Sequence, residues 1–113
     1  MSDTIFGKII SKEMPADIIY EDEHCMAFRD VNPQAPVHFL VVPLKPIARL
    51  QDISTGDEAV IGHVHTVITA LADQEGIADA YRVVVNSGAA AGQSVFHLHF
   101  HVLGGRRMSW PPG

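Results

Sequence analysis

Hydrophobic and polar positions alternate most regularly near the end of the chain, over residues 95–103. His97, His99 and His101 occupy every second position of the central part of this segment. A period of two is typical of a β-strand, whose successive side chains point to opposite faces of a sheet. The pattern therefore predicts a strand that carries three imidazoles on one face. The opposite, buried face would consist of Phe96, Leu98, Phe100 and Val102.

Four other segments have the length and composition of strands. They cover residues 17–20, 24–28, 38–42 and 81–86. An acidic turn joins the first two into a hairpin, and Pro43 ends the third because proline cannot donate a hydrogen bond to a central strand. Together with the histidine segment, these runs predict a sheet of five strands.

Two segments follow the period of a helix instead. The first is short and is capped by Asp3 or Thr4. Its apolar face would consist of Ile5, Phe6, Ile9 and Ile10. The second covers residues 57–75, with a capping box at 54–57 before it and Gly76 after it. The order of the elements predicts an α+β fold on a mostly antiparallel five-stranded sheet.

The chain has 113 residues, of which 47% are hydrophobic. This suffices for one ordinary core, and the chain contains neither a repeat nor a linker. We therefore expect a single domain over residues 1–113, with an irregular tail at 104–113. The net charge of −5 argues against a protein that binds a nucleic-acid polymer through its backbone.

Cys25 is the only cysteine, which excludes an intrachain disulfide and favours a reducing compartment. The N-terminal residues lack the pattern of a signal peptide, and no apolar run approaches the roughly 18 residues of a membrane span. We therefore expect a cytoplasmic protein that does not bind membranes.

The row of three histidines allows three interpretations. A half-solvated strand can simply present polar residues to water, although Thr, Lys or Glu would serve as well. His-x-His on a strand can also present ligands to zinc. In the third interpretation, one neutral imidazole attacks phosphorus while others donate hydrogen bonds to phosphate oxygens.

The loop at residues 86–94 lies directly before the histidine row and favours the third interpretation. It is uncharged and contains Gly88 and Gly92, so we expect its backbone N–H groups to turn inward around an anion. Gln93 and Ser94 add side-chain donors. The alternative is a plain hairpin loop without a role in binding. A zinc site with three histidines needs no such donors, whereas a phosphoryl group needs several.

The other four histidines allow simpler interpretations. His63 and His65 are two residues apart on a predicted helix, so we expect them on different faces at the surface. His24 is expected to be a strand or turn residue without a chemical role. A buried His38 at the start of its strand could hydrogen-bond to the histidine row and select a tautomer.

Residues 97–103 also resemble the His-φ-His-φ-His-φ-φ signature of the histidine triad (HIT) superfamily, where φ is apolar. Further motifs, distributed along nearly the whole chain, resemble its nucleotide-binding (HINT) branch. They lie at residues 3–10, 33–36, 38–41, 92–95, 102–106 and 110–113. On this set of motifs, in this order, the chain is similar to the HINT proteins.

The resemblance implies a purine nucleoside phosphoramidase that needs no cofactor and no metal. Such an enzyme cleaves the P–N bond of adenosine 5′-monophosphoramidate-type substrates, and guanosine counterparts and acyl-adenylates are further candidates. His99 would attack phosphorus and form a nucleotidyl-histidine that water then hydrolyses. His97 would hold His99 in the required tautomer, with His38 as a further support. His101 and Ser94 would meet the phosphate oxygens and the leaving group.

The resemblance also implies a nucleotide pocket in which Asp30 binds the ribose hydroxyls. The apolar slot for the base would consist of Ile5, Phe6, Ile9, Ile18 or Ile19, and Phe28. The phosphate side would consist of Asn86, Gly92, Gln93, Ser94, Val95, His99 and His101.

The same resemblance implies a two-fold homodimer whose sheets join, with the tail around Trp110 near the partner. Arg29 and Pro46 replace histidines that many relatives carry, so we expect the contacts at that rim to differ.

Two other functions stay open. One is a dinucleoside polyphosphate hydrolase that uses the same triad on a P–O–P bond, and the other is a nucleotide-binding or protein-interaction module with little turnover.

Overall fold

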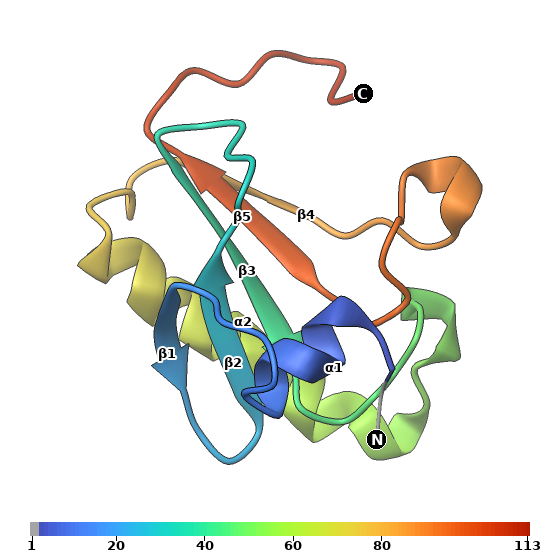
Figure 1. Cartoon of the computed structure of the whole chain (residues 1–113). Coiled ribbons are helices and arrows are strands. Elements are labelled where there is room, and N and C mark those ends of the chain that lie inside the picture. Colours follow the sequence, from blue (N-terminus) through green and yellow to red (C-terminus); the bar gives the residue numbers. More distant parts are fainter. Residues whose placement is uncertain (1–2) are drawn as a thin grey trace.

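The computed structural model describes residues 3–113, and its elements follow the predicted order (Figure 1). The α-helices are α1 (Ile5–Ile10) and α2 (Glu58–Gln74). The strands are β1 (Ile18–Glu21), β2 (Cys25–Arg29), β3 (Val37–Pro43), β4 (Tyr81–Val84) and β5 (Phe100–Gly104). Short 3₁₀ turns cover Leu50–Asp52, Thr55–Asp57 and Ala89–Ala91.

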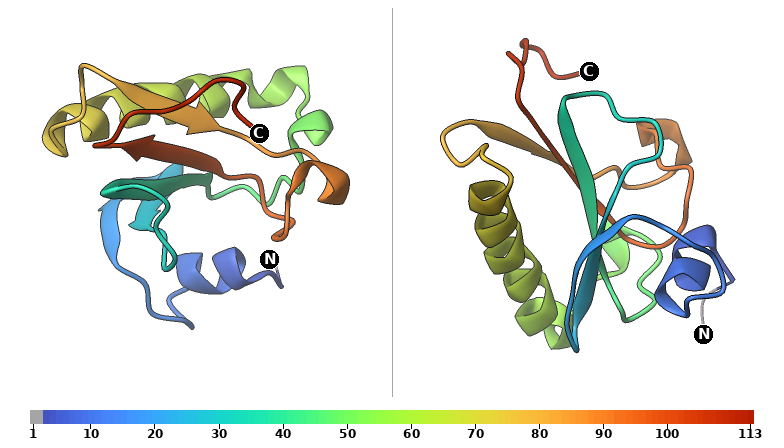
Figure 2. Two further views of the ribbon diagram at one scale, coloured as in Figure 1. Left: turned by 90° about the horizontal axis from the view of Figure 1, so that it is seen from above. Right: turned by 60° about the vertical axis from the view of Figure 1, so that its left-hand side comes forward.

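The five strands form one sheet in the order β1-β2-β3-β5-β4, and every neighbouring pair is antiparallel. Helix α2 covers one face of this sheet, and the short α1 lies against the other face (Figure 2). The predicted α+β fold is therefore confirmed. Within residues 3–113, no helix combines the length and the apolar character needed to cross a membrane.

Alternation along the central strands divides the core into two apolar clusters. Ala27 of β2 packs in the cluster beneath α2, whereas its neighbour Phe28 packs in the cluster beside α1. The same two faces continue across the neighbouring strands. Phe28 pairs with Leu40, and Leu40 pairs with His101. Directly paired residues share a face. His101 therefore lies on the face that α1 partly covers.

The helix signals in the sequence are confirmed. Thr4 caps α1 by accepting a hydrogen bond from the N–H of Gly7 at 3.1 Å. Ser54 and Asp57 form the reciprocal capping box immediately before α2. Gly76 follows the helix end with a φ of +77°, a left-handed conformation that glycine adopts without steric cost.

The predicted histidine strand is wrong in its first half, because only Phe100–Gly104 pairs with β3. The N–H of Leu98 bonds to the Ile47 carbonyl at 2.7 Å instead of joining the sheet. Phe96 is 43% exposed rather than buried. Pro43 ends β3 and has no N–H for a further ladder bond, so the chain opposite it is free to turn away.

The irregular tail begins at Gly105, one residue later than predicted, because Gly104 still belongs to β5. Arg82 on β4 donates a hydrogen bond to the Ser109 carbonyl at 2.9 Å, which holds the tail near this edge of the sheet. Trp110 nevertheless remains 82% exposed. Its indole is not covered by the described part of its own chain.

Candidate active site

A cleft of about 270 Å³ opens between α1 and the sheet, on the face that carries His101. It is lined by Ile5, Phe6, Ile9, Met14, Pro15, Ala16, Phe28, Arg29, Asp30, Val31, Leu40 and Val95. Most of these side chains are apolar, so the cleft suits a flat, uncharged ring with a polar group at one end.

The structure brings together most of the residues predicted for the base slot. Ile5, Phe6, Ile9 and Phe28 all line the cleft, and Asp30 lies at its edge. Ile18 is not among the lining residues, but it packs against the apolar cluster to which Phe6, Ile9 and Phe28 belong. The structure thus places Ile18 next to the lining of the cleft and not in it. Six further lining residues are Met14, Pro15, Ala16, Arg29, Val31 and Leu40. The sequence pattern did not assign any of these to the base slot, and it indicated Leu40 only as part of a strand.

His99 is buried next to this cleft, where it packs against the lining residue Phe6. Its ring lies edge-on to Phe6, with 4.9 Å between the ring centroids. Its Nδ1 is 2.7 Å from the backbone carbonyl of His97. Because a carbonyl can only accept, Nδ1 carries the proton and Nε2 keeps its lone pair. His99 is therefore a neutral imidazole with one free nitrogen, the form that a nucleophile requires.

His97 supports His99 in a different way from the one predicted. The group that fixes the His99 tautomer is the His97 backbone carbonyl, and the His97 ring points elsewhere. This ring is buried and donates from Nε2 to the carbonyl of Pro43 at 2.7 Å. It joins the segment before β5 to the end of β3, at the point where the ladder between the strands stops.

His38 and His101 form a hydrogen-bonded pair on the same face as His99. The N–H of Gln34 donates to Nδ1 of His38 at 3.0 Å, so the proton of a neutral His38 is on Nε2. That Nε2 lies 3.0 Å from Nδ1 of His101 and can donate to it. Nε2 of His101 then carries a proton as well. The ring centroids of His101 and His99 are 5.0 Å apart, so the two imidazoles are direct neighbours.

Asp30 lies beside this pair as well as at the cleft. Its Oδ2 is 3.4 Å from His38 Nε2 and 3.9 Å from His101 Nδ1. Its Oδ1 accepts a hydrogen bond from the N–H of Asn32 at 2.8 Å. The same three residues, Asp30, His38 and His101, offer ligand atoms within 4.8 Å of one another. They are the group in this site that could hold a metal ion.

Burial is the main reason why the pKa values of these histidines lie below the usual value for an imidazole. It lowers the pKa of His97 and of His99, although hydrogen bonds to carbonyls oppose the shift in both. Burial also lowers the pKa of His38, against the opposing charge of Asp30. The pKa of His101 falls to about 4, through burial and then through the neighbouring His99 and His38. All four imidazoles are therefore neutral near pH 7.

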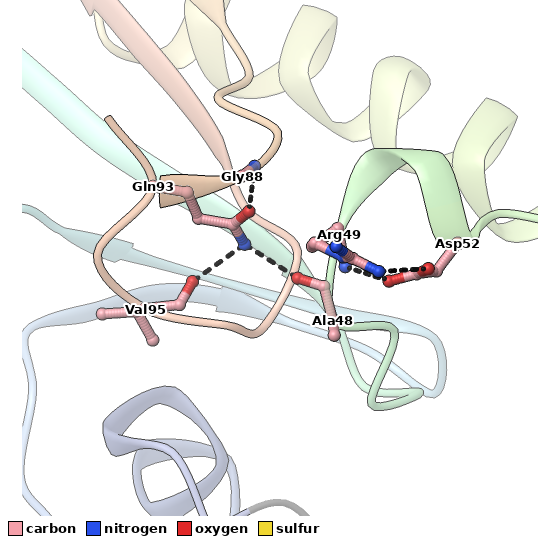
Figure 3. Close-up of polar contacts among 6 residues, drawn as sticks. All are labelled: Ala48, Arg49, Asp52, Gly88, Gln93 and Val95. Atoms are coloured by element: carbon pink, nitrogen blue, oxygen red, sulfur yellow. Dashed lines mark hydrogen bonds and ion pairs between the residues drawn. The ribbon is translucent and has the colours of Figure 1, made fainter. Parts of the chain in front are cut away.

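The loop before the histidines is held by Gln93, whose amide spans three segments (Figure 3). Its Oε1 accepts from the N–H of Gly88 at 2.8 Å. Its Nε2 donates to the carbonyls of Ala48 at 2.8 Å and Val95 at 3.0 Å. Gln93 is 3% exposed. The prediction that its side chain is a free donor for phosphate is thus corrected, because the amide is used to fix the loop.

The predicted cradle of inward N–H groups is also corrected. Hydrogen bonds inside the loop already use the N–H groups of Gly88, Ala91, Gly92 and Gln93. The loop is a closed turn, and its two glycines have φ values of +95° and +103°. Ser94 lies at the end of the loop and is exposed.

The remaining predicted residues lie around this loop. Val95 lines the cleft and packs against the cluster beside α1. The Asn86 side chain lies against Gly92, where an added Cβ would be 3.6 Å from its amide nitrogen. Arg29 does not offer its guanidinium to the rim: Nη1 and Nη2 bind the two oxygens of Glu75 at 2.6 and 3.1 Å.

Comparison with known proteins agrees with this architecture. The model of the HIT domain family matches residues 11–108. An uncharacterised HIT-like protein from Synechococcus elongatus is 58% identical, over 98% of this chain and 97% of its own. A protein from Zea mays described as a 14 kDa zinc-binding protein is 50% identical, over 99% of this chain and 89% of its own.

Solved structures give the same result. A HIT family hydrolase from Legionella pneumophila has a TM-score of 0.96 and 42% identity, and the match covers 98% of this chain and all of that one. A histidine triad nucleotide-binding protein from Candida albicans has a TM-score of 0.83 and 27% identity, over 98% and 85% of the two chains. The chain therefore belongs to the HIT domain family.

Proposed function

We propose that this protein is a purine nucleoside phosphoramidase that works through a covalent nucleotidyl-His99 intermediate. The observation that carries the proposal is the free Nε2 of His99, whose ring packs against Phe6 in the lining of an apolar cleft. The names of the structural relatives, a HIT family hydrolase and a histidine triad nucleotide-binding protein, support the same class of reaction.

In the first step, the lone pair of His99 Nε2 attacks phosphorus and forms a new P–N bond. The bond from phosphorus to the leaving amine breaks, and the amine departs with the electron pair and with a proton that it takes up from solvent. His99 then carries phosphorus on Nε2 and a proton on Nδ1. The His97 carbonyl, 2.7 Å from that Nδ1, stabilises the positive charge that develops on the ring.

In the second step, water attacks phosphorus, displaces His99 Nε2 and releases to solvent one proton, which matches the proton taken up in the first step. The products are the nucleoside monophosphate and the regenerated neutral histidine. Splitting the reaction in this way lowers each barrier compared with direct attack by water.

We assign His101 to the phosphate oxygens. Its Nε2–H is fixed by the chain of hydrogen bonds from Gln34 through His38, so the donor is oriented before substrate binds. Such preorganised donors stabilise charge in a transition state better than mobile water does. The exposed Ser94 is the second group in this role, on the side of the leaving amine.

The base would lie among Ile5, Phe6, Ile9 and Phe28, and Asp30 at the edge of the cleft would meet the ribose hydroxyls. The family precedent also supports a homodimer. Trp110 is 82% exposed, and a partner chain that covers this indole would bury a large apolar surface.

The test is a comparison of two substrates with the purified protein. We expect turnover of adenosine 5′-monophosphoramidate to exceed that of diadenosine polyphosphate, because the proposed site has residues for one base, one ribose and one phosphate. A preference for the dinucleotide would replace the proposal by a polyphosphate hydrolase. Binding of adenosine monophosphate without turnover of either substrate would indicate a nucleotide-binding module.

A metal at Asp30, His38 and His101 is the alternative chemistry at this site. The proposed reaction needs none, so the rate is expected to be unchanged after dialysis against a chelator. A rate that falls on dialysis and returns with one equivalent of zinc would contradict the metal-free mechanism.

A further inference from the structure

A second cluster of ligating side chains lies under the other face of the sheet. Asp22, Cys25 and His63 each offer one ligand atom, and these atoms lie within 4.8 Å of one another. Asp22 is in the turn between β1 and β2, Cys25 begins β2, and His63 is on α2. None of these three residues lines the cleft next to His99. The proposed phosphoramidase mechanism does not use them.

The carboxylate of Asp22 is oriented by its surroundings. Its Oδ1 accepts hydrogen bonds from the backbone N–H groups of His24 at 2.8 Å and Cys25 at 2.9 Å. This arrangement directs Oδ2 toward α2, where it lies 2.6 Å from His63 Nε2. The hydroxyl of Tyr20 donates to the same Oδ2 at 2.7 Å. Hydrogen bonds of this kind orient carboxylate ligands around bound metals.

The ligand set suits a borderline-soft divalent ion. Thiolate, imidazole and carboxylate are the three ligand types that zinc binds, in a tetrahedron whose ligand atoms are about 3.3–3.6 Å apart. A thiolate and a carboxylate together balance two positive charges. The bound cluster would therefore be neutral, which matters because Cys25 is fully buried.

One member of the cluster, His63, borders a cavity. A cavity of about 240 Å³ is lined by His24, Ala59, Val60 and His63. The rings of His24 and His63 are 5.3 Å apart and inclined at 75° to each other. His24 is outside the group of three ligand atoms that lie within 4.8 Å of one another, so its side chain would have to turn toward the ion to become a fourth ligand.

We propose that Asp22, Cys25 and His63, with His24 as the fourth ligand, form a binding site for one zinc-class divalent ion. The ion replaces the proton shared between Asp22 and His63 and the proton of the Cys25 thiol. It joins the turn between β1 and β2 to helix α2. The site is independent of the His99 reaction, so the two proposals fail separately.

The test is a titration of the metal-free full chain with Co²⁺, a spectroscopic substitute for zinc. We expect one equivalent to bind with the absorption of a cobalt–thiolate bond. His63→Ala should weaken binding by at least about 100-fold and remove this absorption, because a ligand is lost. The matched control is His65→Ala on the same helix, whose side chain is exposed and bonds only to the Ile61 carbonyl at 2.9 Å. It should bind like the wild type.

Two further variants identify the site. Cys25→Ala should remove the thiolate absorption, whereas His101→Asn, which disrupts the cluster in the cleft, should leave it unchanged. Saturating zinc should raise the Tm of the wild type and of His65→Ala but not that of His63→Ala. Binding without a thiolate signature, binding that survives His63→Ala, or no saturable binding would each overturn the proposal. In those cases the cluster is a hydrogen-bonded junction only.

Discussion

The three histidines of the row differ at the level of single residues. His99 has a free Nε2, His101 receives a hydrogen bond from His38, and the His97 ring binds the Pro43 carbonyl. The sequence predicted that the rings would have unequal roles, but only through the resemblance. It could not predict the partner of each nitrogen, because those partners come from β3 and from the turn of the chain before β5.

This difference leads to a prediction on paired substitutions. His97→Gln keeps a side-chain donor for the Pro43 carbonyl and leaves the backbone carbonyl that binds His99 in place. It should retain kcat/KM within about 10-fold. His99→Gln removes the nucleophile and should lower kcat by at least about 10³-fold. Steady-state kinetics on a phosphoramidate substrate measures both. Equal losses in the two variants would contradict the assignment of separate roles.

At the level of elements, the alternation of residues predicted the strands and the sheet faces. It failed at 95–99 because period-two polarity does not require a hydrogen-bonded partner. The sequence predicts that the loop at 86–94 binds phosphate, but its glycines close a turn and its glutamine holds the loop in place. Small polar loops look alike in sequence, whether their donors bind the loop itself or a ligand.

Gln93 should therefore be essential for the loop. Gln93→Ala leaves the Gly88 N–H and the Ala48 carbonyl without their partner, and we expect a loss of about 1–3 kcal/mol in unfolding free energy. The rate on phosphoramidate should fall as well, because the loop leads directly into the histidine row. Gln74→Ala, at the exposed end of α2, is the control and should change neither quantity. Urea unfolding and kinetics on both variants check this, and an unchanged Gln93→Ala protein would refute it.

Two glycines should respond in opposite directions to the same substitution. At Gly104 in β5, an added Cβ would lie 2.8 Å from the Ile77 side chain, so Gly104→Ala should destabilise the fold by about 1–3 kcal/mol. At Gly62 in α2, nothing lies within 4 Å of such a Cβ. Gly62→Ala should stabilise the fold by about 0.5–1 kcal/mol through helix propensity. Thermal unfolding compares them, and shifts of the same sign would be inconsistent with the packing described.

At the level of the whole molecule, the buried histidines link stability to pH. The pKa of His101 is lowered to about 4, below the value of about 6.5 expected in the unfolded chain. The unfolded state then binds more protons between these values, so stability rises with pH from about 4 to 6.5 and is complete above that range. Lowering the pH from 7 to 5 should cost about 2 kcal/mol through His101 alone.

Urea unfolding at the two pH values measures this effect. His101→Asn is the matched variant, since it removes the titrating ring and should lose less stability over the same interval. His38, His97 and His99 also have lowered pKa values and contribute in the same direction. An identical loss in the wild type and in His101→Asn would show that His101 does not carry the effect.

The proposed mechanism requires that His99 becomes covalently linked to the nucleotide. Mass spectrometry can detect this link directly, in protein that is mixed with adenosine 5′-monophosphoramidate, quenched during turnover and then mapped by peptides. We expect a mass increase equal to one adenylyl group, located on His99 and absent from the His99→Gln variant. Rapid hydrolysis with no adduct on His99 at any quench time, or an adduct on another residue, would contradict it.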